Sequence, residues 1–234
     1  MSVAAIVPAA GRGERLGPGQ PKALRLLGGV PMLVHAVRAL SRARLVDLVV
    51  VAAPPDGVAE VKALLASHEV GAEVAVVAGG EERQDSVARA LEALPADVDV
   101  VLVHDAARPL APSELVDVVA AAVLGGHPAV VPGLRVADTV KRVAIGGSLE
   151  TVSETVPRDD LRAIQTPQGF DRAVLAKAHA TADTRVTDDA GLVERLGVEV
   201  VVVPGSPEAF KITRPLDLML AEMVVAQRRA NGAL

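Results

Sequence analysis

The chain has 234 residues, of which 50% are hydrophobic and 23% are charged, and its formal net charge is −5. This length and composition predict one domain with a sizeable core, residues 1–234. The acidic balance and an aromatic content of 1% disfavour nucleic-acid binding, because neither a basic surface nor stacking side chains are available.

The chain has no cysteine, which excludes disulfides and thiolate metal sites. No apolar run reaches the length of a membrane span, and no segment of signal type precedes the first expected strand. We therefore expect a cytoplasmic location and no membrane partner.

The first expected strand, residues 3–7, runs into a glycine-rich loop. Arg12, Arg15 and Lys22 add positive charge in and after this loop, and such a strand end favours a polyphosphate. A dinucleotide-binding loop would need glycine in place of Leu16, and the lysine of a P-loop would open a helix directly. An ordinary turn with solvated arginines is the alternative interpretation.

Helical and strand-like segments alternate after this loop. The expected elements are helix 31–43, strand 46–53, helix 57–67, strand 73–78, helix 85–94, strand 98–103, helix 112–124 and strand 129–132. This alternation predicts an α/β fold with a Rossmann-like, mostly parallel sheet and helices on both faces. Ligands in that architecture bind beyond the carboxyl ends of the strands.

Two further loops are expected at the same rim of the sheet. Strand 73–78 leads to residues 79–86, where Asp85 or Ser86 has helix capping as an alternative role. Strand 98–103 leads to His104 and Asp105, and a carboxylate beside a polyphosphate suits Mg²⁺ or another divalent cation. A purely structural aspartate is the alternative for Asp105.

The alternation ends in a predicted two-stranded hairpin at about residues 135–152, with its turn at the Gly146 and Gly147 pair. A hairpin that protrudes from a parallel sheet favours pairing with a second subunit, so we interpret it as a dimerisation arm. The remaining expected elements are a turn at 165–168, helices from 171 and 187, strands 198–203 and 208–212, and helix 214–228.

Several motifs together carry a resemblance to a known family. They are Ala9-Ala10-Gly11-x-Gly13-x-Arg15, Pro21-Lys22, Gly79-Gly80-x-x-Arg83-x-x-Ser86, His104-Asp105-Ala106-Ala107-Arg108-Pro109, Asp138-Thr139, Arg158, Thr166-Pro167-Gln168, Thr187-Asp188 and Lys211-x-Thr213-Arg214-Pro215. From end to end the chain resembles the 2-C-methyl-D-erythritol 4-phosphate cytidylyltransferases of non-mevalonate isoprenoid synthesis. Glu14 and Glu81 depart from the common family pattern.

The resemblance implies a homodimer joined through the arm, with CTP, Mg²⁺ and methylerythritol phosphate as ligands. It also assigns residues to three roles. The implied catalytic residues are Arg15, Lys22 and Lys211. The implied nucleotide-binding residues are Ala9, Ala10, Gly11, Arg12, Gly13, Gly80, Glu81, Arg83 and Ser86. The implied acceptor-binding residues are Asp105, Arg108, Thr139, Arg158 and Lys211, with Asp105 also on the metal.

The predicted reaction needs no general base, because the attacking phosphate monoester is largely dianionic at neutral pH. The residues alone are also consistent with two other functions. One is cytidylyl transfer to ribitol or ribulose 5-phosphate on the same framework. The other is a non-catalytic nucleotide-binding module, which retention of Arg15, Lys22, Asp105 and Lys211 disfavours.

Overall fold

The computed structural model describes the whole chain except residues 12–20, 72, 145, 147–148, 183–185 and 233–234. Its helices are α1 Met32–Ser41, α2 Val58–Ala66, α3 Arg83–Glu92, α4 Ser113–Leu124, α5 Arg172–Ala180, α6 Asp189–Arg195 and α7 Pro215–Ala230. Its strands are β1 Ser2–Pro8, β2 Leu26–Leu27, β3 Val30–Pro31, β4 Leu48–Ala53, β5 Glu73–Ala78, β6 Val98–Val103, β7 Ala129–Arg135, β8 Val140–Ala144, β9 Thr151–Val156, β10 Arg162–Ile164, β11 Gln168–Asp171 and β12 Val201–Pro204.

One eight-stranded sheet organises the body, in the order β10-β7-β11-β6-β1-β4-β5, with β12 also paired to β7. The pairs β1–β4, β1–β6, β4–β5 and β7–β12 are parallel, whereas β11 runs antiparallel to both of its neighbours. The prediction of a mostly parallel α/β sheet is confirmed.

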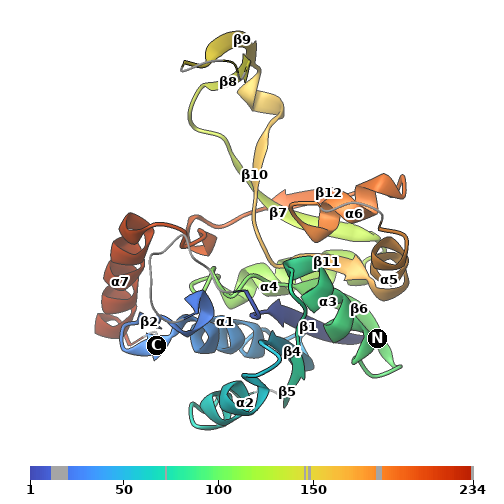
Figure 1. Cartoon of the computed structure of the whole chain (residues 1–234), viewed down its shortest axis with the longest axis vertical. Coiled ribbons are helices and arrows are strands. Elements are labelled where there is room, and N and C mark those ends of the chain that lie inside the picture. The colour runs from blue at the N-terminus through green and yellow to red at the C-terminus, as the bar shows by residue number, and fades with distance from the viewer. Residues whose placement is uncertain (12–20, 72, 145, 147–148, 183–185, 233–234) are drawn as a thin grey trace.

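Alternate residues of the central strands face two separate cores, as the twofold repeat of a strand requires. Val3, Ala5 and Val7 pack with α1, α2 and α4 on one face. Ala4 and Ile6 pack with α3, α5 and α6 on the other. β1 and β4 are almost entirely apolar because helices cover both sides of the sheet (Figure 1).

One strand was missed and one expected strand was wrong. Residues 165–167 lie outside any strand, as the expected turn requires, but they lead into β11, which starts at Gln168 and lies between β6 and β7. A Cβ on Gly169 would come within 2.7 Å of Val119 Cγ1, so this short strand uses glycine to let α4 approach. The expected strand 208–212 is instead a 3-10 turn, Pro207–Ala209, followed by residues outside any strand. Ala209 and Ile212 are buried against helices and loops rather than in the sheet.

The arm projects from the body between the end of β7 and the start of β10 (Figure 1). Its hairpin, β8–β9, pairs antiparallel with an irregularity between Arg142 and Val143. The hairpin was predicted, but it extends to Val156 rather than ending at about residue 152. In the part of the chain that the structure describes, no helix is long and apolar enough to cross a membrane.

Candidate active site

Three strand ends meet at one rim, as the parallel sheet predicts. They are the ends of β1, β5 and β6, and the 3-10 turn Lys22–Leu24 and the segment around Lys211 join them. The result is a pocket of about 210 Å³. It is lined by Pro8, Ala9, Ala10, Gly11, Lys22, Ala23, Arg83, Ser86, Asp105, Ala106, Ala107 and Lys211.

Asp105 is the only carboxylate among the described residues that line this pocket. Its Oδ1 accepts a hydrogen bond from Arg83 Nε at 3.1 Å, and its Oδ2 lies 2.7 Å from Lys211 Nζ. Burial by itself would raise the pKa of the Asp105 carboxyl, but the charges of Arg83 and Lys211 outweigh it and hold that pKa far below its ordinary value. Asp105 is therefore a fixed anion between two cations.

Arg83 is held by a second carboxylate on its far side. Its Nη1 donates to Asp189 Oδ2 at 2.6 Å, and His179 Nε2 lies 3.0 Å from Asp189 Oδ1. The Asp189 side chain is only 1% exposed. Burial raises the pKa of the Asp189 carboxyl, but the Arg83 charge and the His179 contact outweigh that effect and lower it. Contacts from Asp105 through Arg83 and Asp189 to His179 thus connect the pocket to helices α5 and α6.

Sequence reasoning missed Asp189 and His179. Asp188 was part of a family motif and of an expected helix start, whereas Asp189 was interpreted only as part of that helix start. Asp188 does cap α6 by accepting Gly191 N–H at 3.1 Å. Asp189, one position further on, turns inward to Arg83. Two adjacent aspartates at a helix start are the only signal, and it does not say which of them is buried.

His104 lies behind Asp105 and is fully buried. Its Nε2 donates to the Arg108 carbonyl at 3.2 Å, so its Nδ1 accepts from the Thr166 hydroxyl, also at 3.2 Å. Thr166 Oγ1 in turn accepts the Asp105 N–H at 3.0 Å. Burial lowers the pKa of His104 to about 4. The imidazole is therefore neutral and engaged at both nitrogens, which fits a positioning role for the Asp105 backbone and not that of a general base.

The loop after β5 is fitted closely to the pocket. Ser86 Oγ accepts the Gly80 N–H at 3.0 Å and donates to the Glu82 carbonyl at 3.0 Å. A Cβ on Gly80 would come within 2.2 Å of Asp85 Cβ, so only glycine fits there. Asp85 accepts the Glu82 N–H at 3.1 Å as part of a capping box, which confirms the capping alternative for Asp85.

The other predicted site residues fall into three groups. Arg12, Gly13 and Arg15 lie outside the described residues. Gly80 and Glu81 come shortly before the pocket residues Arg83 and Ser86 in the chain, but they do not line the pocket. The last group comprises Arg108, Thr139 and Arg158.

Arg108 was predicted to bind the acceptor, yet its guanidinium faces backbone carbonyls. Nη1 donates to Ala209 O at 2.7 Å and Nη2 to Ile164 O at 3.3 Å, whereas buried Nε has no partner among the described residues. Arg108 therefore anchors the segment that leads to Lys211.

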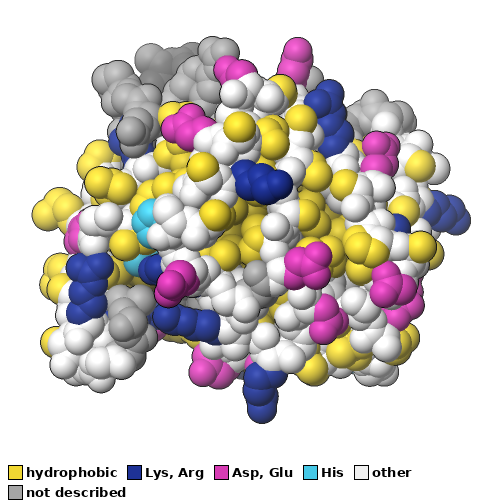
Figure 2. Space-filling model, turned by 90° about the horizontal axis from the view of Figure 1, so that it is seen from below, with side chains coloured by type: hydrophobic (Ala, Val, Ile, Leu, Met, Phe, Trp, Pro, Cys, Tyr) yellow, Lys and Arg dark blue, Asp and Glu magenta, His cyan; other side chains and the backbone are white. Residues whose placement is uncertain are grey.

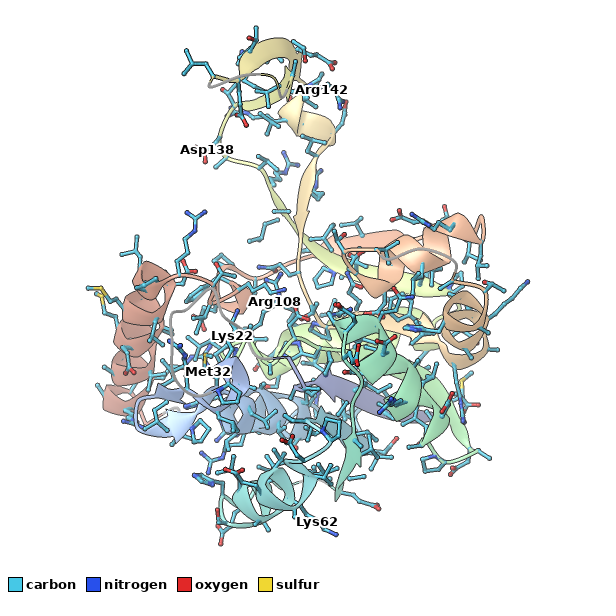
Figure 3. The ribbon with its side chains drawn as sticks, viewed as in Figure 1. Lys22, Met32, Lys62, Arg108, Asp138 and Arg142 are labelled. Atoms are coloured by element: carbon cyan, nitrogen blue, oxygen red, sulfur yellow. The ribbon has the colours of Figure 1, made fainter. Side chains whose placement is uncertain are left out.

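Thr139 and Arg158 lie on the arm and are exposed, and Arg158 donates to the Ala137 carbonyl. Lys22 and Arg108 lie in the body, whereas Asp138 and Arg142 lie far above them on the arm (Figure 3). One protomer therefore does not bring its own arm residues to its own pocket.

The pocket fits a divalent cation only as a companion of a phosphorylated ligand. Among the described residues no group of three or more His, Cys, Asp or Glu side chains is arranged to hold a metal ion. Asp105 offers one carboxylate, and Mg²⁺ is commonly held by one or two carboxylates together with phosphate oxygens and water. Of the two cations on Asp105, Lys211 is the more exposed, with a side chain 39% accessible, so it is the easier to displace.

Comparison with known proteins gives the family of the chain. Residues 3–227 match the family model of 2-C-methyl-D-erythritol 4-phosphate cytidylyltransferase. A protein of that name from Streptomyces avermitilis is 61% identical over 233 residues, covering 97% of this chain and 93% of that protein.

Solved structures are also similar. The 2-C-methyl-D-erythritol 4-phosphate cytidylyltransferase of Thermus thermophilus is 39% identical, with a TM-score of 0.74 and coverage of 97% of this chain and 100% of the other. The 4-diphosphocytidyl-2C-methyl-D-erythritol synthase of Anaerococcus prevotii is 29% identical, with a TM-score of 0.81 and coverage of 96% of each chain.

Proposed function

The chain belongs to the 2-C-methyl-D-erythritol 4-phosphate cytidylyltransferase family, and from that membership we propose how its residues carry out the reaction. It transfers the cytidylyl group of CTP to 2-C-methyl-D-erythritol 4-phosphate, giving 4-(cytidine 5'-diphospho)-2-C-methyl-D-erythritol and pyrophosphate, in non-mevalonate isoprenoid precursor synthesis. The observation that carries the mechanism is a pocket lined by Lys22, Arg83 and Lys211, in which Arg83 and Lys211 contact the carboxylate of Asp105.

The reaction joins two anions, so its main barrier is charge repulsion. An oxygen of the acceptor phosphate attacks the α-phosphorus of CTP, a P–O bond forms, and the bond to the β-phosphate breaks as pyrophosphate leaves. No proton has to be removed from the nucleophile, since a phosphate monoester is largely dianionic at neutral pH. The neutral, buried His104 is consistent with a reaction that needs no base.

Positive charge fixed in advance is then the principal catalytic device. We assign Lys22 and Arg15 to the triphosphate and to the charge that develops at the α-phosphorus, and Lys211 to the acceptor phosphate. Bound Mg²⁺ would supply further positive charge to the triphosphate oxygens, with Asp105 as its protein carboxylate. Ala9, Ala10, Gly11, Gly80 and Ser86 would form the cytosine side of the site, because the loop after β5 packs directly against Ala10.

Pyrophosphate release with a small panel of substrates tests this function. CTP with methylerythritol phosphate is expected to turn over, whereas UTP or ATP with the same acceptor is expected to turn over at least about 100-fold more slowly, the discrimination of a site that hydrogen-bonds one base. Faster transfer to ribitol 5-phosphate would reassign the acceptor. CTP binding without release on any acceptor would indicate the non-catalytic module.

We further propose that the enzyme is a homodimer whose arms complete the partner's site. Thr139 and Arg158 are exposed on an arm that points away from its own pocket, which supports this arrangement. Mixing the Lys211→Ala and Arg158→Ala variants tests it. Random exchange makes half of the dimers hybrid, and each hybrid has one intact site, so activity should recover to about a quarter of the wild-type value. If the site belonged to one protomer, the mixture would recover nothing.

A further inference from the structure

Helix α7 carries an apolar stripe that nothing in the described protomer covers. Leu216, Met219, Leu220 and Met223 are 72%, 65%, 50% and 70% exposed. Their spacing of three, four and seven residues places them on one face of the helix. Hydrophobic side chains protrude at the left edge of Figure 2, the side on which α7 lies in Figure 1. Large contiguous apolar surface of this kind usually marks an interaction site.

The other face of α7 is already packed. Ala221 and Val225 are buried in a small cluster with Leu27, Met32 and Ile212. The helix is therefore apolar on two sides, and only one side is explained by the fold of a single chain.

A second uncovered apolar surface lies on the arm. Val143 and Val152 are direct partners in the β8–β9 register, and they are 36% and 56% exposed. Leu149, near the turn, is 82% exposed. A two-stranded hairpin is marginally stable alone in water, so these side chains need a surface to pack against.

The sequence places each surface beside residues of the proposed shared site. Thr139 directly precedes β8 and Arg158 follows β9 by two residues, so both lie at the base of the hairpin. Val143 lies four residues beyond Thr139, roughly 13 Å along a strand. On the body, α7 starts four residues after Lys211, and its stripe from Leu216 to Met223 covers roughly 10 Å of helix.

We propose that the apolar tip of the arm of a second copy, Val143, Leu149 and Val152, docks on the α7 stripe. This rests on the proposed homodimer and extends it. With the partner's Thr139 and Arg158 at the Asp105–Lys211 pocket, the hairpin reaches past the pocket and onto α7. A twofold dimer makes the contact twice. Asp217 and Glu222 place negative charge on α7 beside the stripe, which disfavours an anionic membrane surface as the occupant.

The absence of cysteine from the chain allows a direct test. The Met219→Cys/Val152→Cys variant, treated with a short bismaleimide, should give a covalent dimer as the main product. Met219→Cys alone and Val118→Cys/Val152→Cys serve as matched controls, since Val118 is 46% exposed on α4. Both controls should stay largely monomeric on a denaturing gel. Equal cross-linking by Met219→Cys alone would mean that α7 packs on α7, and equal cross-linking through Val118 would mean random collision; either result overturns the proposal.

A second measurement separates this contact from the proposed function. Light scattering should show that Met219→Glu/Met223→Glu shifts the protein from dimer to monomer while CTP still binds, whereas Val118→Glu remains dimeric. Pyrophosphate release should fall at least tenfold in the first variant. If the double variant stays dimeric and active while mixed Lys211→Ala and Arg158→Ala subunits recover activity, the shared site stands and the α7 contact is wrong. If wild-type protein releases no pyrophosphate, the proposed function itself fails.

Discussion

Two ion pairs show how differently the body and the arm are held. Arg83 and Asp189 lie 2.6 Å apart in the body, with side chains 30% and 1% exposed. Arg142 and Glu154 lie 2.9 Å apart on the arm, with side chains 66% and 53% exposed. The distances are similar, but water screens the second pair and not the first. The side chains of the pocket are therefore held in place before any ligand binds, whereas the arm depends for its stability on the surface that it packs against.

The largest expected effect comes from breaking the buried pair. Asp189→Asn should lower the free energy of unfolding by about 3–5 kcal/mol, because it leaves the Arg83 charge buried with one partner fewer. Urea unfolding followed by circular dichroism measures it. Asp99→Asn, at a carboxylate that is 48% exposed, is the control and should change stability by less than about 0.5 kcal/mol. Equal effects of the two variants would mean that burial does not set the contribution of the Arg83–Asp189 pair.

Lys22→Ala should lower kcat by about 100-fold, since removing one preorganised donor to transition-state charge costs about 3 kcal/mol. Its unfolding free energy should hardly change. Exposed Lys62 on α2 provides the matched control, and Lys62→Ala should keep wild-type kcat. A Lys22→Ala enzyme with near-normal kcat would remove this lysine from the catalytic role.

The body should also lose stability in acid because of His104. Its pKa is lowered to about 4 in the folded protein from 6.5, so the unfolded chain binds the extra proton first as the pH falls. Stability is then complete above pH 6.5 and declines towards pH 4, by about 3 kcal/mol in total. Burial lowers the pKa of His35 in the same direction. Asp105 and Asp189 have lowered pKa values, so their contribution is lost only below the ordinary carboxyl value of 3.8.

The His104→Gln variant isolates this effect. Its unfolding free energy, measured in urea at intervals from pH 7 to pH 4, should fall less steeply than that of the wild type. Only the slope is diagnostic, because the substitution also alters packing. Parallel pH profiles for the two proteins would exclude His104 as the source.

The sequence predicted the alternating strands and helices of the body. Uninterrupted apolar strands and amphipathic helices indicated the parallel sheet, and the ends of its strands indicated the rim where Ala10, Ser86 and Asp105 meet. Because strand ends converge for topological reasons, these residues could be grouped without coordinates. The positive charge after the glycine-rich loop indicated Lys22, and the family resemblance assigned catalytic roles to Lys22 and Lys211.

What the sequence did not predict depends on single tertiary contacts. β11 is four residues long, contains Gly169 and belongs to the sheet through its pairing with β6 and β7, which are distant in sequence. Residues 208–212 look like a strand because their buried residues are apolar, yet Ile212 bonds through its N–H to Ala107 O, outside any strand pair. The pairing of Arg83 with Asp189 joins residues 106 positions apart, and no local pattern reports it.

The smallest expected effect is on the arm. Arg142→Ala should change the unfolding free energy by less than about 0.5 kcal/mol, as for other exposed pairs, and a double-mutant cycle with Glu154→Ala should give a coupling of the same size. Calorimetry at dimer-forming protein concentrations measures it. The contact proposed for the partner's α7 uses the Val143–Val152 pair and leaves Arg142 and Glu154 to solvent, so the coupling should stay small in the dimer as well. A coupling above about 1.5 kcal/mol would mean that the charged side of the hairpin is buried on assembly, and the arm would then have to turn its other face to the partner.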